Sequence, residues 1–130
     1  SGFSRNLRKE ITKSSKWFFY DNGIRNIIIG NLNALTERQD IGALWENYVL
    51  AERIKFQNYS GMIVQNYFWR TYDQQEIDWV EEREGKLFAY EIKWKEKICK
   101  IPQAWGKTYP DSVFETIHPE NYRKWIGAGE

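Results

Sequence analysis

This sequence has very few of the residues from which covalent and metal-bound frameworks are built. Its 130 residues include one cysteine, one histidine and three prolines. Because one cysteine cannot form a disulfide within the chain, Cys99 is typical of a reducing compartment, and we expect a cytoplasmic protein. Zinc is usually held by several Cys and His side chains, and only Cys99 and His118 are available. A zinc site is therefore not expected.

Long apolar runs are also missing. No stretch approaches the roughly 20 apolar residues that a membrane-spanning helix needs, and no secretion signal is visible, so we do not expect a membrane partner. The chain begins with Ser1-Gly2 in place of a methionine, and we interpret it as a piece of a larger protein. Residues 1–16 would be the tail of a preceding linker, and residues 17–130 one folded domain.

Charge of one sign does not dominate. The formal net charge is +1, which neither favours nor excludes a polyanionic partner. The distribution is uneven, because residues 5–16 and 93–107 are basic whereas residues 73–84 are acidic. A basic segment can follow a row of phosphates or can be an ordinary solvated face, and for residues 5–16 both interpretations stay open.

Aromatic residues, in contrast, are abundant. The chain has seven Trp, eight Tyr and seven Phe, and hydrophobic residues make up 42% of it. This composition is typical of a globular protein with a substantial core. The tryptophans are most simply core residues, although an exposed Trp69 or Trp105 would be able to stack on nucleobases.

Hydrophobic periodicity predicts a mixed α/β fold. An apolar run from Lys16 begins like a strand, and residues 40–57 have the spacing of a wide-faced helix that Asp40 can cap. One stripe of that helix holds Ile41, Leu44, Trp45 and Tyr48, and a second holds Glu46, Val49, Leu50 and Arg53. Strands are expected at 60–72, 76–83, 87–95 and 112–119, with helices opening at Pro102 and Pro119.

These elements follow the order helix, three strands, helix, strand. The three sequential strands have short turns and should be antiparallel, and the last strand can lie parallel to the third after its helical crossover. Residues 87–95 are apolar on both faces at first, which favours an inner strand of the sheet.

Three charged residues occupy strand positions where sheets disfavour them. Asp78 lies in the second of the sequential strands, and Glu91 and Lys93 lie one residue apart in the third. Strict alternation puts Asp78 and Val80 on one face, with Ile77 and Trp79 on the other. A turn near Gly85 brings Asp78 roughly opposite Glu91 or Tyr90.

Two carboxylates that lie this close repel each other, and a positive charge must offset that repulsion. Two like charges raise each other's pKa unless a cation lies between them, and oxygen ligands suit Mg²⁺ or Mn²⁺. Lys93 would add a fixed positive charge that orients water or stabilises a phosphate. A third carboxylate could come from the preceding helix, and periodicity alone does not choose Glu46 over Glu52.

The pattern Asp78 followed by Glu91-Ile92-Lys93 resembles the D…(D/E)-x-K motif of the PD-(D/E)XK nuclease superfamily. The blocks KWFFYDNGIRN, GALWENYVLAER and YFWRTYDQQEIDWVEEREGKLFAYEIKW resemble more closely the uncharacterised C-terminal domain of bacterial and archaeal AAA-type ATPases, over roughly residues 5 to 95. The superfamily's usual proline before the aspartate is Ile77 here. No GxxxxGK[ST] motif occurs, so an ATP-binding module would lie upstream of this chain.

The resemblance implies a restriction-endonuclease-like fold and Mg²⁺-dependent phosphodiester hydrolysis, with DNA as the expected partner. Asp78 and Glu91 would then be metal ligands and catalytic residues, with the carbonyl of Ile92 and the carboxylate of Glu46 as further ligands. Lys93 would act on water or phosphate. Gln103 matches an accessory glutamine of some nuclease branches, and is otherwise a surface residue.

Two other functions remain open. The same fold can be catalytically silent and serve for dimerisation, nucleic-acid binding or recognition of a protein partner. It can also act on RNA instead of DNA, which the sequence does not distinguish.

Overall fold

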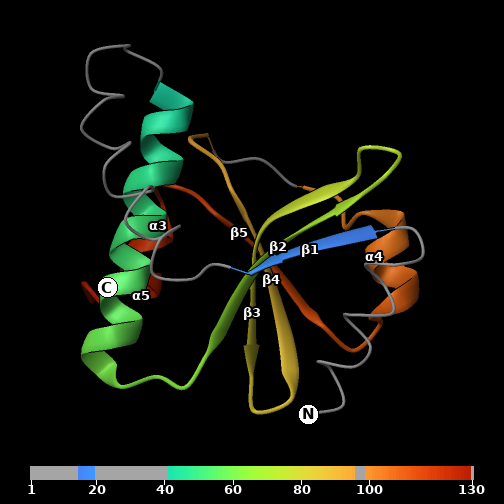
Figure 1. Cartoon of the computed structure of the whole chain (residues 1–130). Helices are drawn as coiled ribbons and strands as arrows, with labels where there is room; N and C mark the ends of the chain where they lie inside the picture. Colours follow the sequence, from blue (N-terminus) through green and yellow to red (C-terminus); the bar gives the residue numbers. More distant parts are fainter. Residues whose placement is uncertain (1–14, 20–40, 96–98, 130) are drawn as a thin grey trace. The chain divides into compact units, whose positions relative to one another are not determined.

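A computed structural model of the chain describes residues 15–19, 41–95 and 99–129. Figure 1 shows its elements, which in chain order are β1 (Ser15–Phe19), α3 (Ile41–Ser60), β2 (Gln65–Thr71), β3 (Glu76–Arg83), β4 (Lys86–Ile92), α4 (Gln103–Thr108), β5 (Val113–Ile117) and α5 (Tyr122–Trp125). The predicted order of helix, three strands, helix and strand is present from α3 to β5. The fold is mixed α/β, as the periodicity predicts.

The strands form one sheet in the order β1-β2-β3-β4-β5. The first four pair antiparallel with their neighbours, with Ser15 opposite Thr71 at one edge and Arg83 opposite Lys86 beside the hairpin turn. β4 lies between β3 and β5, which confirms that it is an inner strand. The sheet therefore places β3 and β4, which carry Asp78 and Glu91, away from its edges.

The chain divides into two compact units. The first contains residues 1–20, 64–91 and 99–115, and the second contains residues 21–63, 92–98 and 116–130. The first unit thus holds β1 to β3, most of β4, and α4. The second holds α3 and α5 together with the ends of β4 and β5.

A buried cluster on one face of the sheet forms the core of the first unit. Its members are Trp69, Ile77, Val80, Leu87, Ala89, Trp105 and Tyr109. The rings of Trp69 and Trp105 meet edge to face with centroids 5.3 Å apart, which joins β2 to α4. Both tryptophans are 0% exposed, so the interpretation as core is confirmed and neither is available to stack on a base.

The turn between β2 and β3 also holds α4 in place. The side-chain oxygen of Gln75 accepts a hydrogen bond of 3.0 Å from the amide of Ala104, in the first turn of α4. The first amides of a helix have no partner inside the helix, so this bond satisfies one of them. It fixes the short helix to the edge of the hairpin.

Helix α3 buries a different face from the one its first stripe predicts. Val49, Leu50 and Arg53 of the second stripe are buried, whereas Ile41 of the first stripe is 48% exposed. Of the first stripe only Trp45 is buried. The expectation that Ile41 belongs to a buried face is therefore wrong, because α3 packs inward through the second stripe and Trp45, and Ile41 in its first turn stays exposed.

The end of α3 explains why the next strand starts late. The sequence predicts a strand from Ser60, but α3 continues through Ser60 and β2 begins at Gln65. Gly61 has a φ of 70°, and its amide donates to Asn58 while the amide of Met62 donates to Gln57. These two bonds form the Schellman motif that ends many helices at a glycine.

Arg53 fastens α3 to α5 within the second unit. Its guanidinium donates a 2.7 Å hydrogen bond to the carbonyl of Trp125 and lies 4.6 Å from the centre of that indole ring. Figure 1 shows α5 beside α3, in agreement with these contacts. A buried guanidinium needs such partners, because an unpaired buried charge is costly.

Two predictions lie outside the described residues. These are the basic tail within residues 1–14 and Asp40 as the cap of α3. The division at residue 16 stays a prediction. None of the described helices is long and apolar enough to cross a membrane.

Candidate functional site

The hairpin of β3 and β4 brings Asp78 and Glu91 together within the first unit. The two strands pair with Trp79 opposite Tyr90, and this register continued by one pair sets Asp78 opposite Glu91. The backbone amide of Asp78 donates a 3.2 Å hydrogen bond to Oε1 of Glu91. Both residues are half-buried. Two residues that the sequence proposes as metal ligands therefore meet on neighbouring strands.

The turn sequence is what sets this register. Glu84 and Gly85 have φ values of 52° and 74°, so both central residues are left-handed, as in a two-residue type I′ hairpin. Arg83 and Lys86 already pair, which places Lys86 in β4 and not in the turn as predicted. A tight turn of fixed length leaves no freedom to slide, so the opposition of Asp78 and Glu91 follows from it.

A β-bulge interrupts the alternation of β3. The pairing with β2 shifts between Tyr67 and Trp69. Two residues of β3, Asp78 and Trp79, therefore lie opposite the single residue Phe68 of β2. Ile77 and Val80 consequently lie in the same buried cluster. The prediction that strict alternation puts Ile77 and Val80 on opposite faces is wrong for this reason.

Ile92 and Lys93 follow Glu91 directly and belong to the second unit. Ile92 is buried at the last position of β4. Lys93 lies just beyond the strand and is half-buried, and its amide donates a 2.8 Å hydrogen bond to the carbonyl of Ile117. The backbone that carries the lysine is therefore tied to the end of β5.

Glu46 lies on α3, in the second unit, and is half-buried. Within residues 41–95 and 99–129, no group of three or more His, Cys, Asp or Glu side chains is placed to hold a metal ion. What the structure brings together is thus the pair Asp78 and Glu91. Glu46 and the Ile92 carbonyl stay predicted ligands.

The remaining candidates take structural positions. Gln103 is exposed at the start of α4. His118 follows the end of β5, and its Nδ1 accepts a 3.2 Å hydrogen bond from the amide of Glu120. Cys99 is a free, half-buried thiol.

Sequence reasoning missed a buried carboxylate in β3. Glu81 is 0% exposed, and its oxygens accept from the indole of Trp79 at 2.9 Å and pair with Nε of Arg83 at 3.2 Å. The Arg83 guanidinium also lies 3.7 Å from the ring centre of Phe88 and donates to the hydroxyl of Tyr90. The spacing of two puts Trp79, Glu81 and Arg83 on one face of β3, but the sequence does not show that this face is covered.

Glu82, on the next position of β3, influences a tyrosine of β2. Burial, followed by the nearby charge of Glu82, raises the pKa of the Tyr67 hydroxyl. The acidic run of the sequence is therefore not simply a solvated face. Part of it lies inside the first unit, with hydrogen-bonding or charged partners.

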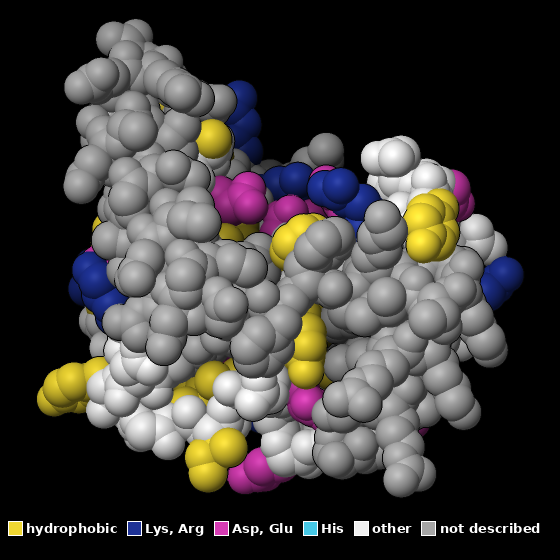
Figure 2. Space-filling model, viewed as in Figure 1, with side chains coloured by type: hydrophobic (Ala, Val, Ile, Leu, Met, Phe, Trp, Pro, Cys, Tyr) yellow, Lys and Arg dark blue, Asp and Glu magenta, His cyan; other side chains and the backbone are white. Residues whose placement is uncertain are grey.

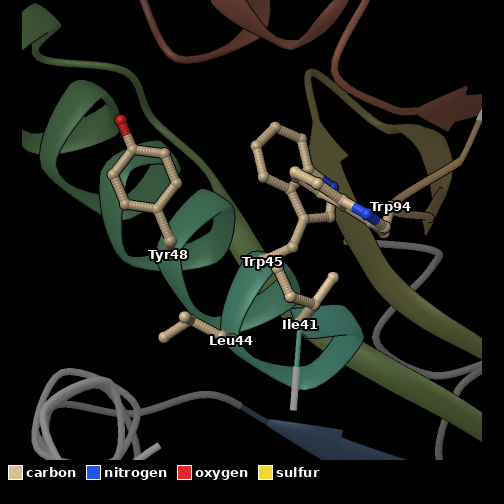
Figure 3. A pocket seen from close by; sticks show the side chains of 5 residues that line it. All are labelled: Ile41, Leu44, Trp45, Tyr48 and Trp94. Atoms are coloured by element: carbon tan, nitrogen blue, oxygen red, sulfur yellow. The ribbon is translucent and has the colours of Figure 1, made fainter. Parts of the chain in front are cut away.

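An apolar pocket in the second unit was also missed. It has a volume of about 360 Å³ and is lined by Ile41, Leu44, Trp45, Tyr48 and Trp94. Figure 3 shows four of these side chains projecting from α3, with the Trp94 ring beside Trp45. The first stripe of α3 forms most of this pocket. Helical spacing alone predicts a core stripe, and only the residues that pack against the stripe show that part of it lines a pocket.

Comparison with known proteins gives a partial match. Residues 41–101 match a family model described as a domain of unknown function (DUF4143). The chain is 29% identical over 92 residues to the uncharacterized proteins Rv2008c of Mycobacterium tuberculosis and Mb2031c of Mycobacterium bovis. These alignments cover 68% of this chain and 20% of each relative, so the chain spans about one fifth of the length of the curated relatives it matches. No solved structure matches it.

The region matched by DUF4143 runs from the start of α3 to the residues just before α4. It includes all five residues that the sequence proposes for the site, which are Glu46, Asp78, Glu91, Ile92 and Lys93. The names of the relatives state no activity. The function must therefore be argued from the site itself.

Proposed function

We propose that this chain is a nuclease-like domain with a restriction-endonuclease-like fold, and that it hydrolyses phosphodiester bonds of DNA with the help of Mg²⁺ or Mn²⁺. The observation that carries the proposal is the contact between Asp78 and Glu91 on paired inner strands, with Lys93 two residues further along the chain. The order of elements from α3 to β5 supports it as well.

The carboxylates suit a hard divalent cation. Mg²⁺ is commonly held by one or two carboxylates, and water and substrate phosphates complete its coordination. Asp78 and Glu91 supply such a pair, and the Ile92 carbonyl and Glu46 are the further ligands that we propose. When bound, the ion would lower the pKa of a coordinated water and neutralise charge on the phosphate.

Lys93 has a separate task in this proposal. Its ammonium is a fixed positive charge that orients a water or stabilises negative charge developing on a phosphate oxygen. The hydrogen bond between its backbone amide and Ile117 restricts where the side chain begins, which favours such positioning. Glu91 accepts a hydrogen bond from the Asp78 amide, which helps to hold its carboxylate in one orientation.

The setting of the domain is part of the same proposal. Because the curated relatives are several times longer than the matched region, we infer that the domain is joined to an upstream ATPase module, and that ATP binds there. A single free cysteine suits a cytoplasmic protein that meets DNA. A homodimer would place two such sites on one duplex.

Cleavage of plasmid DNA tests the proposal most directly. The 130-residue chain should nick or linearise plasmid in Mg²⁺ or Mn²⁺ and should not do so in EDTA. Lys93→Ala should lower the rate at least about 100-fold, because a fixed charge at the reacting phosphate is lost. Lys124→Ala removes an exposed lysine of α5 and should leave the rate unchanged.

Calorimetry completes this test. Wild-type chain should bind Mn²⁺, and Asp78→Asn should weaken that binding. Absence of both divalent-ion binding and plasmid cleavage in folded wild-type chain would overturn the proposal. Cleavage that survives Lys93→Ala would reject the role of the lysine. The same assay with a labelled RNA strand decides between DNA and RNA as substrate.

A second candidate function is a catalytically silent interaction module. Large exposed hydrophobic side chains favour it, because Tyr59 near the end of α3 is 94% exposed and Ile63 just after it is 92% exposed. On the face shown in Figure 2, hydrophobic side chains of the described residues reach the surface in separate places. If the chain dimerises through this end of α3, Tyr59→Ser with Ile63→Ser should convert the dimer to a monomer in sedimentation velocity.

A further inference from the structure

The pocket in the second unit combines aromatic walls with an open, apolar interior. Its volume of about 360 Å³ lies within the range of small-molecule sites, roughly 300–1,000 Å³. Three of its five lining residues are aromatic, namely Trp45, Tyr48 and Trp94. Ile41 at its rim is 48% exposed. A planar aromatic ligand fits this lining better than a polar one.

Among the aromatic residues that line the pocket, Trp94 is exposed to solvent. Its ring meets Trp45 at an interplanar angle of 65° with centroids 5.4 Å apart, and the residue is 41% exposed. The two indoles therefore do not stack flat on each other (Figure 3). Tyr122 of α5 also packs against Trp45, with ring centroids 4.8 Å apart. Trp45 is thereby fixed, whereas Trp94 can offer part of its ring to a ligand.

Basic residues flank Trp94 in the chain, and Arg123 lies near Tyr48. Trp94 lies between Lys93 and Lys95 in the chain, and Lys95 is exposed. Burial raises the pKa of the Tyr48 hydroxyl, and the positive charge of Arg123 lowers it, so Arg123 lies close to Tyr48. Glu52 is the acidic neighbour of Tyr48, and it pairs with Lys55 at 3.8 Å. Cations around an aromatic pocket favour a ligand that carries phosphates and flat rings.

We infer that this pocket binds a nucleobase of single-stranded DNA by stacking on Trp94, while Lys93 and Lys95 contact the adjoining phosphates. Bases stack on exposed aromatic side chains with little dependence on sequence, and a basic flank follows the backbone. The inference deepens the proposed function and depends on it for nucleic acid as the ligand. It makes the bound nucleic acid a single strand with an unstacked base.

Binding of a labelled 12-nucleotide dT strand in EDTA tests this inference without any cleavage. Fluorescence anisotropy should show that the wild-type chain binds dT12 more tightly than a 12-nucleotide strand with abasic sites throughout, because the phosphates are equal and only the bases differ. Trp94→Leu should weaken dT12 binding roughly fivefold to thirtyfold. Trp94→Phe keeps a ring and should retain most of the affinity.

Matched variants make the result specific. Trp94→Leu should leave the weaker binding of the abasic strand unchanged, because the lysines stay. Tyr59→Ala removes an aromatic residue of α3 that is 94% exposed and lies away from the pocket lining, and it should bind dT12 as wild type does. If Trp94→Leu does not fold, the comparison of dT12 with the abasic strand on wild-type chain still decides.

Three results would overturn the inference. They are equal affinity of wild-type chain for dT12 and the abasic strand, unchanged dT12 binding in folded Trp94→Leu, and tighter binding of a 12-base-pair duplex than of dT12. Base-dependent binding without any metal-dependent cleavage would instead uphold the pocket and reject the proposed hydrolysis. The two proposals can therefore fail separately.

Discussion

At the scale of single residues, Asp73 shows how a short turn orders its side chains. The hydroxyl of Thr71 and then the amide group of Gln75 donate to its carboxylate, and these bonds hold the pKa of Asp73 below its usual value. The same Thr71 hydroxyl accepts from the backbone amide of Gln75 at 3.0 Å. Gln75 in turn reaches the first turn of α4, so this small network joins the hairpin to a helix.

A pH dependence follows from the lowered pKa of Asp73. Because its pKa is lower in the folded chain than in the unfolded chain, Asp73 contributes stability above about pH 4 that is lost as the pH falls through the folded value. Asp73→Asn should therefore be less stable than wild type at pH 6, and should lose less stability between about pH 5 and pH 2. Urea unfolding followed at several pH values measures both effects.

Asp111→Asn provides the control for this prediction, because Asp111 is an exposed aspartate away from the Thr71 turn. It should keep the acid sensitivity of wild type. Equal acid-induced losses in Asp73→Asn and wild type would contradict the role given to the turn.

For the charged residues of the first unit and the site, the sequence shows which residue types are unusual for a strand, but it does not show which of them are buried. The charges of Asp78, Glu91 and Lys93 stand out because strands disfavour them. Glu81 does not stand out from the acidic residues around it, yet it is the one that is fully buried. Burial depends on which face the rest of the chain covers, and a single strand sequence does not contain that information.

At the scale of elements, the end of α3 is set by one glycine. Gly61 is left-handed with a φ of 70°, and a Cβ there would meet nothing within 4 Å. Its effect is therefore conformational and not steric. Gly61→Ala should lower the free energy of unfolding by about 1–2 kcal/mol, because an L-residue pays that amount in the left-handed region. Thermal and urea unfolding measure the loss.

Gly106 in α4 is the matched control for Gly61. Its φ is not in the left-handed region, and a Cβ would lie 3.6 Å from Cγ2 of Ile101, which is an ordinary contact. Gly106→Ala should be neutral or should stabilise the chain by up to about 1 kcal/mol, since alanine is the better helix former. If the two substitutions had equal effects, the Schellman motif would not be what matters at Gly61.

The elements were predicted well where a local signal defines them. The hairpin of β3 and β4 follows from Gly85 between two alternating strands, and α3 follows from its periodicity. The predicted start of β2 at Ser60 is wrong, because α3 continues through Ser60 and β2 begins only at Gln65. Propensity is a weak guide at such a boundary, because the capping hydrogen bonds decide it.

At the scale of the whole molecule, the proposed metal site predicts a linkage between ion binding and stability. If Mg²⁺ or Mn²⁺ binds the folded chain at Asp78 and Glu91, the midpoint of thermal unfolding should rise with ion concentration. At 100 times the dissociation constant the gain is about 2.7 kcal/mol. Asp78→Asn should abolish this gain. Without metal it should be as stable as wild type or more stable, since it relieves like-charge repulsion with Glu91.

Differential scanning fluorimetry with and without Mn²⁺ measures this linkage, and Asp111→Asn is again the control. An equal ion-dependent rise in Asp78→Asn and wild type would place the ion elsewhere. A loss of stability in ion-free Asp78→Asn would show that repulsion is not the dominant interaction of this carboxylate.

The sequence by itself determined the mixed α/β order, the antiparallel hairpin and the opposition of Asp78 and Glu91 on its two strands. These follow from local patterns, because turn chemistry and alternation act between residues that are near in the chain. Tertiary structure decided which stripe of α3 is covered, which carboxylate is buried and where the bulge shifts β3. It also opened an aromatic pocket at Trp94. Each of these depends on what packs against an element, and that partner comes from a distant part of the chain.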